Sequence, residues 1–234
     1  MDYSAIALFT YNVPHRKTEE VVSRLFWEGI PIACMIAAEH VQLNIPASTV
    51  RTRIRHREPI HPQELARRLN VPYYAAPHNS PETVRILKDH RIELGLIAGA
   101  RILKADIIEA CGKGIVNLHP GLIPEARGLD TLLWSIRNDI PLGVTAHLID
   151  SRVDAGRLLL KRMIKIYRDD TIFDLAERLN ETQIDMLKPS IEAAFRQQTI
   201  PCDFTGTSYY RKMPAQLEKK ALSKLPRYIE RHAT

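Results

Sequence analysis

The chain has 234 residues, of which 45% are hydrophobic and 26% charged, a composition typical of a globular protein with a full core. No hydrophobic stretch approaches the roughly 18 residues needed to cross a bilayer, and the first residues do not resemble a secretion signal, so we expect a cytoplasmic protein. The net charge of +6 suits an anionic ligand. Cys34, Cys111 and Cys202 are odd in number and far apart, which argues against a disulfide framework and against a metal site.

Short hydrophobic segments alternate with amphipathic ones along the chain. Residues 5–10 and 31–38 predict strands, and residues 18–27 predict a helix between them with Thr18 as its N-cap. Residues 43–60 are irregular and basic. Further on, the pattern predicts strands at 72–76, 93–98, 114–117, 143–149 and 157–166. It predicts helices at 62–70, 80–90 (with Ser80 as N-cap), 104–111, 129–138, 171–197 (broken near Pro189) and 214–230.

This alternation predicts an α/β fold with a mainly parallel twisted sheet and helices on both faces. Residues 1–200 would form the main domain, and residues 201–234 a short C-terminal appendage that contains a helix. In such sheets, ligands bind beyond the carboxyl ends of the strands. Asn117 and His119 directly follow the apolar segment that ends at Val116, so we expect a site at this edge.

Two separated motifs, at 117–120 and 153–156, supply the chemistry for acyl transfer to an amine. The amide of Asn117 can polarise a carbonyl, the imidazole of His119 can move a proton, and the carboxylate of Asp154 can fix that imidazole. Each residue alone would be read as a turn or loop former, but their shared setting after apolar strands favours a catalytic set. His147 lies within a predicted strand, either as a core histidine or as a support for this set.

The segments Asn117–Pro124 and Arg127–Leu129, followed by Gly143–His147 and Val153–Gly156, resemble the signature of the formyltetrahydrofolate-dependent formyltransferases. The resemblance is strongest over residues 94–166. It implies a Rossmann-like formyltransferase fold and N10-formyltetrahydrofolate as cosubstrate, with no metal. It also implies that Asn117 donates to the oxyanion, that His119 takes or relays the proton of the amine, and that Asp154 supports the charged imidazole.

The same resemblance implies a folate pocket. Its residues would be Ala98, Gly99, Arg101, Ile102, Leu103, His147, Ile149 and Asp150. The match around Gly99 is loose, and a plain turn at the end of a strand is the competing interpretation of residues 98–103.

The formyl acceptor is expected to be a nucleotide-linked amino sugar of the 4-amino-4,6-dideoxyhexose type, for surface polysaccharide. Residues 11–17 contain no glycine, unlike the phosphate-binding loop of glycinamide ribonucleotide transformylases. The expected substrate-binding residues are Asn12, His15, Arg16, Lys17, Arg53, Arg55, Pro120, Gly121, Arg127, Tyr209 and Tyr210. The alternating arginines at 51–57 are also compatible with a solvated edge strand, and the two tyrosines with packing of the tail.

Several alternatives remain open. Phosphoribosylglycinamide formyltransferase of purine synthesis is the main one, whereas the 34 residues after Ile200 are few for a tRNA-binding domain. A formyltransferase-like protein without catalysis and an RNA-binding module belong to other classes, but basic residues are spread along the chain without an aromatic RNA-reading motif. We therefore expect neither nucleic acid nor membrane as partner, and the tail helix is a candidate for pairing two chains in a homodimer.

Overall fold

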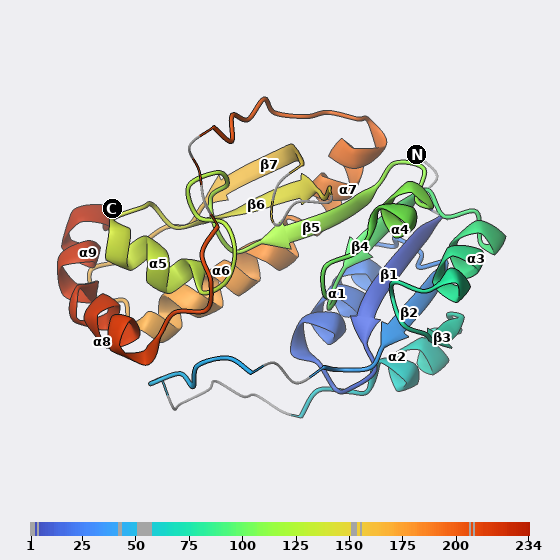
Figure 1. Cartoon of the computed structure of the whole chain (residues 1–234), viewed down its shortest axis with the longest axis horizontal. Helices are drawn as coiled ribbons and strands as arrows, with labels where there is room; N and C mark the ends of the chain where they lie inside the picture. Colours follow the sequence, from blue (N-terminus) through green and yellow to red (C-terminus); the bar gives the residue numbers. More distant parts are fainter. Residues whose placement is uncertain are drawn as a thin grey trace.

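The computed structural model describes residues 3, 5–41, 44–50, 58–150, 154, 156–205, 207 and 209–234. Within these residues a twisted sheet has the strand order β3-β2-β1-β4-β5-β6-β7 (Figure 1). Its strands are β1 (Ile6–Tyr11), β2 (Cys34–Ala38), β3 (Tyr73–Ala75), β4 (Leu94–Ile97), β5 (Ile115–His119), β6 (Gly143–Leu148) and β7 (Arg157–Met163).

The sheet is parallel from β3 to β5, and β6 and β7 add an antiparallel end. The predicted α/β fold with a mainly parallel sheet is therefore confirmed. The chain winds from β1 to β2 and β3 on one side and then crosses to β4 on the other. Such a reversal leaves a crevice at the carboxyl ends of the two central strands, where ligands of open α/β sheets bind.

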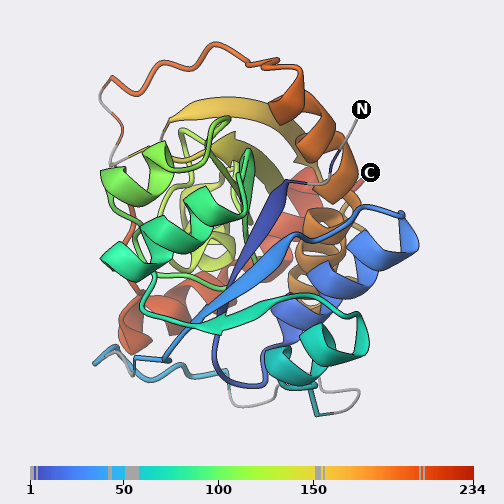
Figure 2. The same cartoon turned by 90° about the vertical axis from the view of Figure 1, so that its right-hand side faces the viewer.

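Helices cover both faces of the sheet, as predicted (Figures 1 and 2). In Figure 2, α1 and α7 lie on one side of the sheet and α3 and α4 on the other, and α6 packs with α1 and α7. The helices are α1 (Arg16–Trp27), α2 (Pro62–Arg68), α3 (Pro81–Asp89), α4 (Ala105–Glu109), α5 (Thr131–Asn138), α6 (Ile172–Asp185), α7 (Leu187–Phe195), α8 (Ala215–Ser223) and α9 (Leu225–His232).

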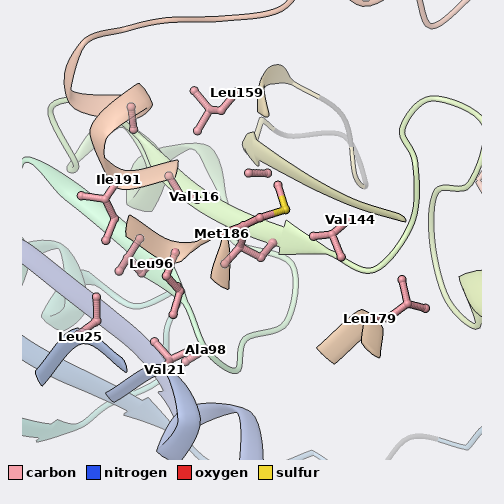
Figure 3. Close-up of a cluster of buried hydrophobic side chains, with 14 of the residues drawn as sticks. Val21, Leu25, Leu96, Ala98, Val116, Val144, Leu159, Leu179, Met186 and Ile191 are labelled. Atoms are coloured by element: carbon pink, nitrogen blue, oxygen red, sulfur yellow. The ribbon is translucent and has the colours of Figure 1, made fainter. Parts of the chain in front are cut away.

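The core is split by the sheet into two hydrophobic clusters. Side chains alternate along a strand, so Leu8 of β1 belongs to the larger cluster and its neighbour Phe9 to the smaller one. In the larger cluster, Val21 and Leu25 of α1 approach Leu96 of β4 (Figure 3). Complete burial of side chains of this size stabilises the fold by about 1.5–3 kcal/mol each.

The caps of two helices were predicted with different success. Ser80 accepts a hydrogen bond from the amide of Thr83, and Pro81 begins α3, so this prediction is confirmed. The prediction of Thr18 as a cap is wrong, because α1 already begins at Arg16. Thr18 is buried within the first turn, and its hydroxyl lies 2.6 Å from that of Thr10 on β1.

Two element boundaries also differ from the prediction. The segment 171–197 divides at Met186 rather than at Pro189. Pro189 lies in the first turn of α7, where backbone N–H groups have no partner within the helix, so a proline is tolerated there. Strand β5 continues through His119, whereas the prediction ended it at Asn117. The antiparallel partner β6 extends the pairing to His119–Thr145.

The C-terminal residues pack against the main body. Tyr228 and Ile229 of α9 belong to the larger core cluster, and the Tyr228 hydroxyl donates to the Ile140 carbonyl at 2.7 Å. The backbone amide of Thr234 donates to Ile166 at 3.0 Å. The expected division at residue 200 stays a prediction. Among the described residues, none of the helices has the length and apolar character of a membrane span.

Candidate active site

Strand β5 places two of the expected catalytic residues on one face of the sheet. Alternation directs Asn117 and His119 to the same side, while Leu118 between them belongs to the larger core cluster. The pairing of β4 with β5 covers Gly95–Ile115 and Leu96–Val116, and β5 then continues beyond it. The two polar residues therefore lie on the stretch of β5 that extends past β4.

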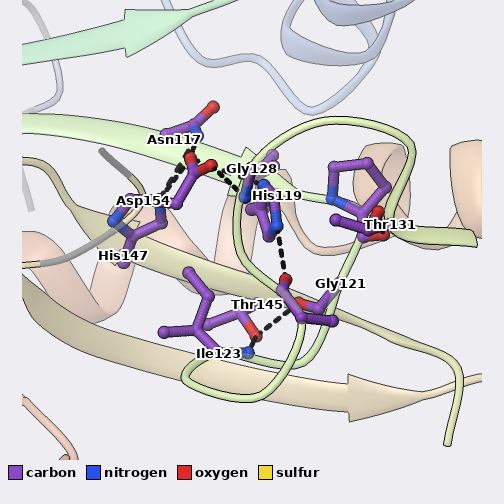
Figure 4. A network of polar contacts seen from close by, with 12 residues as sticks. Asn117, His119, Gly121, Ile123, Gly128, Thr131, Thr145, His147 and Asp154 are labelled. Carbon is purple, nitrogen blue, oxygen red and sulfur yellow. Dashed lines mark hydrogen bonds and ion pairs between the residues drawn. The ribbon is translucent and has the colours of Figure 1, made fainter. Parts of the chain in front are cut away.

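Asp154 reaches the same place from the connection between β6 and β7 (Figure 4). Its backbone adopts the left-handed conformation, with φ of 42°. One carboxylate oxygen accepts a hydrogen bond from the Gly128 amide at 2.8 Å. The other lies 3.5 Å from Nδ1 of His119 and 3.5 Å from Nδ2 of Asn117. The three residues that are far apart in the sequence therefore converge.

Both ring nitrogens of His119 face oxygen acceptors. Nε2 donates to the Ala126 carbonyl at 2.8 Å, and Nδ1 faces Asp154. Burial lowers the pKa of His119, and the cations Lys17 and Arg127 lower it further, while Asp154 and the Ala126 carbonyl raise it. The ring is therefore neutral at rest, with its Nδ1 lone pair available as a base, and a proton taken there would be stabilised by Asp154.

The side-chain nitrogen of Asn117 points toward His147 and Asp154. It donates to Nε2 of His147 at 3.2 Å, and its contact with Asp154 is longer, at 3.5 Å. His147 is fully buried on β6, directly opposite Asn117 in the strand register. An oxyanion role for Asn117 requires one N–H to turn from Asp154 to the substrate, and a contact of this length holds it only weakly.

The loop after β5 is held by Thr145 of β6. Its hydroxyl donates to the Gly121 carbonyl at 2.8 Å and accepts from the Ile123 amide at 3.0 Å. A Cβ at Gly121 would collide with the Ala126 carbonyl oxygen and approach Nε2 of His119 to 2.9 Å. Gly121 is thus required for the close fit of this loop around the imidazole.

The first turn of the chain is bound to the protein itself. Arg16 forms a bidentate ion pair with Glu177, and both N–O distances are 2.7 Å. The ammonium of Lys17 donates to the Leu118 carbonyl at 3.2 Å and to Gln183 at 3.0 Å. The amide group of Asn12 contacts Glu39 at 2.7 Å and the Tyr73 hydroxyl at 2.6 Å. A role for this turn in substrate binding stays a prediction.

The predicted folate segment and this first turn lie next to each other at the ends of β4 and β1. A Cβ at Gly99 would approach the Tyr11 ring to 2.8 Å and Nδ1 of His15 to 3.2 Å. Burial lowers the pKa of His15. Ile102 is 64% exposed, whereas the Leu103 side chain lies in the smaller core cluster, so Leu103 can meet a ligand only through its backbone.

Two further predicted site residues, Arg127 and Tyr210, lie where the tail packs against the loop after β5. Arg127 is buried, donates to Thr207 at 3.2 Å and lies over the Phe204 ring, and the Tyr210 ring stacks on Trp134. The packing of Tyr210 matches the alternative of a packed tail, whereas the packing of Arg127 against the tail was not predicted. Arg53 and Arg55 lie outside the described residues.

Sequence reasoning also missed the backbone groups that hold the expected catalytic set. These are the Gly128 amide and the Ala126 carbonyl. The signal for Gly128 was the glycine after Arg127, because this position has φ of 95°, a conformation that favours glycine. The Ala126 carbonyl had no signal, since any residue carries one.

The fold and the site together define a doubly wound α/β protein with a polar triad at the ligand-binding edge of its sheet. Residues 33–190 match the family model described as formyl transferase, and the chain belongs to this family. It is 27% identical over 148 residues to methionyl-tRNA formyltransferase from Thermosynechococcus vestitus, covering 62% of this chain and 45% of the relative. It is 27% identical over 130 residues to phosphoribosylglycinamide formyltransferase from Bacillus subtilis, covering 51% and 67%.

Solved structures share the fold. A sugar N-formyltransferase from a Shewanella species has a TM-score of 0.63 at 17% identity, with 94% of this chain and 86% of the other covered. The formyltransferase PseJ from Anoxybacillus kamchatkensis, in complex with UDP-4,6-dideoxy-4-formamido-L-AltNAc and tetrahydrofolate, has a TM-score of 0.54 at 22% identity, with 88% and 85% covered. The chain spans less than half the length of the methionyl-tRNA formyltransferases that it matches.

Proposed function

We propose that this protein transfers the formyl group of N10-formyltetrahydrofolate to the amine of a nucleotide-linked amino sugar. The observation that carries the proposal is the convergence of Asn117, His119 and Asp154 at the edge of the sheet, within a chain of the formyl transferase family. An amide donor, a neutral buried imidazole and a carboxylate match the needs of acyl transfer to nitrogen.

In the proposed reaction, the lone pair of the amine attacks the formyl carbon and its carbonyl oxygen becomes an oxyanion. The amide of Asn117 donates to that oxygen, a contact worth roughly 10²–10³ in rate. His119 takes the proton that the amine loses, and Asp154 stabilises the resulting imidazolium. The proton is then delivered to N10 of the folate as the C–N10 bond breaks, so the products are the formamide and tetrahydrofolate.

For the cosubstrate, the proposed pocket uses the ends of β4 and β6. Ala98, Gly99, Arg101, Ile102 and Leu103 would contact the pterin from one side, and His147, Ile149 and Asp150 from the other. The proximity of Gly99 to the first turn supports a shared cavity for the two substrates. The tetrahydrofolate in the PseJ complex supports the same class of cosubstrate.

For the acceptor, we favour a 4-amino-4,6-dideoxyhexose linked to a nucleotide, made in the cytoplasm for surface polysaccharide. The glycine-free turn at residues 11–17 supports this choice, because it disfavours glycinamide ribonucleotide. The fold is shared with a sugar N-formyltransferase and with phosphoribosylglycinamide formyltransferases alike, so it is compatible with both acceptors. The similarity to phosphoribosylglycinamide formyltransferase keeps that nucleotide as the second candidate. The proposed acceptor contacts are Asn12, His15, Arg16, Lys17, Arg53, Arg55, Pro120, Gly121, Arg127 and Tyr209.

The experiment that tests the proposal presents N10-formyltetrahydrofolate with a panel of acceptors and follows release of tetrahydrofolate optically. The panel contains TDP-, UDP- and GDP-linked amino sugars, glycinamide ribonucleotide and methionyl-tRNA. We expect turnover with one of the amino sugars. Turnover with glycinamide ribonucleotide or methionyl-tRNA alone would overturn the proposed acceptor. No release of tetrahydrofolate with any acceptor would overturn the proposed activity.

The variants Asn117→Ala, His119→Ala and Asp154→Asn test the mechanism. We expect each to lower kcat by at least about a hundredfold, because each removes a group that acts on the transition state. Far-ultraviolet circular dichroism and thermal melting verify that the variants fold. Near-normal turnover by folded His119→Ala would show that the proton passes by another route.

A further inference from the structure

The tail runs along the outside of the loop after β5 (Figure 1). We call residues 209–213 the tail segment and residues 120–131 the catalytic loop. The amide of Tyr210 donates to the Arg127 carbonyl at 2.7 Å, and the amide of Leu129 donates to the Tyr210 carbonyl at 2.9 Å. These two bonds form a parallel β-bridge between Tyr210 and Gly128. A short backbone pairing therefore links segments that are about 80 residues apart in the sequence.

Contacts with α5 stabilise this pairing. The Tyr210 ring stacks on Trp134 of α5, with centroids 4.7 Å apart and an angle of 11° between planes. Its hydroxyl accepts from Asn138 at 3.0 Å, and the indole N–H of Trp134 donates to the Arg211 carbonyl at 2.9 Å. A stacked aromatic pair is worth about 0.5–1.5 kcal/mol beyond its burial.

Asp130 binds the last two residues of the tail segment. Its carboxylate pairs with the Lys212 ammonium at 2.7 Å and accepts from the Met213 amide at 2.8 Å. Asp130 immediately precedes α5 and has φ of 52°, so the chain turns sharply here. The tail segment therefore fixes the catalytic loop at its last turn as well as at Gly128.

The inner side of the same loop holds the catalytic set. The Gly128 amide donates to Asp154 at 2.8 Å, and the Ala126 carbonyl accepts from His119 at 2.8 Å. The residues on either side of Gly128 direct their backbone groups outward to Tyr210. Only glycine allows this close approach, because a Cβ at Gly128 would collide with the Tyr210 backbone.

We propose that the tail segment is a positioning element of the active site, which holds Gly128 and Ala126 so that Asp154 and His119 keep their separation. Tyr210 is its principal residue, since it supplies both backbone bonds and the stacked ring. The proposal deepens the function proposed above and rests on it. It assigns Tyr210 to the support of the catalytic loop instead of to substrate binding, the role expected from the sequence.

The test compares Tyr210→Ala, which loses the stacking and the hydroxyl contact, with Tyr210→Phe, which keeps the ring. We expect Tyr210→Ala to lower kcat by about ten- to a hundredfold, because small displacements of catalytic groups have effects of this size. KM for the acceptor should change less than threefold, and Tyr210→Phe should restore most of kcat. A rise in KM with kcat unchanged would assign Tyr210 to substrate binding and overturn the proposal.

The matched control is Arg231→Ala, which removes a different contact between the tail and the body, the ion pair with Asp139. It lies in α9, and its loss should leave kcat unchanged. Lys212→Met is a milder variant of the tail segment itself and should lower kcat in the same direction, even if Tyr210→Ala does not fold. An equal decrease of kcat in Arg231→Ala and Lys212→Met would indicate only a general loosening of the tail, which contradicts the proposal.

A double-mutant cycle shows whether Tyr210 acts through Asp154. In the Asp154→Asn background, Tyr210→Ala should have little further effect on kcat/KM, whereas independent effects would multiply. Multiplying effects would overturn the proposal.

A measurement that needs no turnover separates this inference from the proposed function. The ring resonances of His119, assigned by NMR in the protein without substrate, should shift in Tyr210→Ala and remain in place in Arg231→Ala. Unchanged resonances in folded Tyr210→Ala would overturn the positioning role. A shift in a protein that transfers no formyl group would retain that role and reject only the proposed reaction.

Discussion

At the residue scale, the chemistry depends on the electrostatic environment of His119. Asp154 favours the charged ring, while Lys17 and Arg127 oppose it from two other elements. The ammonium of Lys17 donates a hydrogen bond to the carbonyl of Leu118, the residue between Asn117 and His119 on β5. Burial lowers the pKa of Lys17 to about 8, although Asp154 and Glu20 raise it. At pH 7, Lys17 is therefore mostly charged and helps to keep His119 neutral.

Replacement of Lys17 by Met should raise the pKa of His119, because it removes a cation that disfavours the imidazolium. Since the neutral ring is the proposed base, the acid limb of the pH profile of kcat/KM should move to higher pH. Loss of the bond to the Leu118 carbonyl should also cost about 1–2 kcal/mol of stability. Arg24→Met, which removes a cation from the far end of α1, is the control. An acid limb at the same pH in both variants would refute the electrostatic role.

The residues of the triad were predictable because each follows an apolar segment, and the motif fixes their spacing. The partners of Arg16 and Lys17 were not predictable. Both residues were expected to bind the substrate, and the structure pairs Arg16 with Glu177 and Lys17 with Gln183, more than 160 positions away. Local pattern gives the charge of a side chain, whereas its partner depends on how α6 packs against α1.

At the element scale, β5 combines two environments. Ile115 and Val116 pair with β4, and the residues from Val116 to His119 pair with β6, so the end of β5 is paired with β6 alone in the named pairings. The apolar pattern predicted a strand that ends at Asn117, so His119 was placed after the strand. Pairing with β6 holds Asn117 and His119 on a rigid element, which suits groups that must be placed to within a fraction of an ångström.

The cap of α3 allows a prediction about stability alone. Ser80→Ala removes the acceptor for the Thr83 amide and should lower the free energy of unfolding by about 1 kcal/mol. Because α3 covers the sheet face opposite α1, kcat should not change. Ser80→Asp, which can still accept from the helix amides, should retain most of the stability. The check is urea denaturation together with steady-state kinetics, and a loss of kcat in Ser80→Ala would connect α3 to the site.

At the scale of the whole molecule, buried histidines make stability depend on pH. Burial lowers the pKa of His78 and of His119 below the ordinary value of about 6.5. The unfolded chain therefore takes up these protons before the folded one does. Stability is fully present above about pH 6.5 and falls as the pH decreases below it, by up to about 1.4 kcal/mol per unit for each histidine. Urea titrations at pH 7.5 and 5.5 measure this slope, which His78→Asn should reduce.

The tail and the sheet should unfold as one unit. Tyr228 and Ile229 of α9 lie in the larger core cluster with residues of α1 and β4, so the tail cannot leave without exposing that cluster. Tyr228→Ala should therefore lower the stability of the whole chain by about 3 kcal/mol or more. Fluorescence of Trp134, which lies against the tail, should report the same urea midpoint as far-ultraviolet circular dichroism, which follows the whole fold. If the fluorescence transition came first and Tyr228→Ala moved it alone, residues 201–234 would be a separate unit, and the catalytic loop would then lose its outer support while the sheet was still folded.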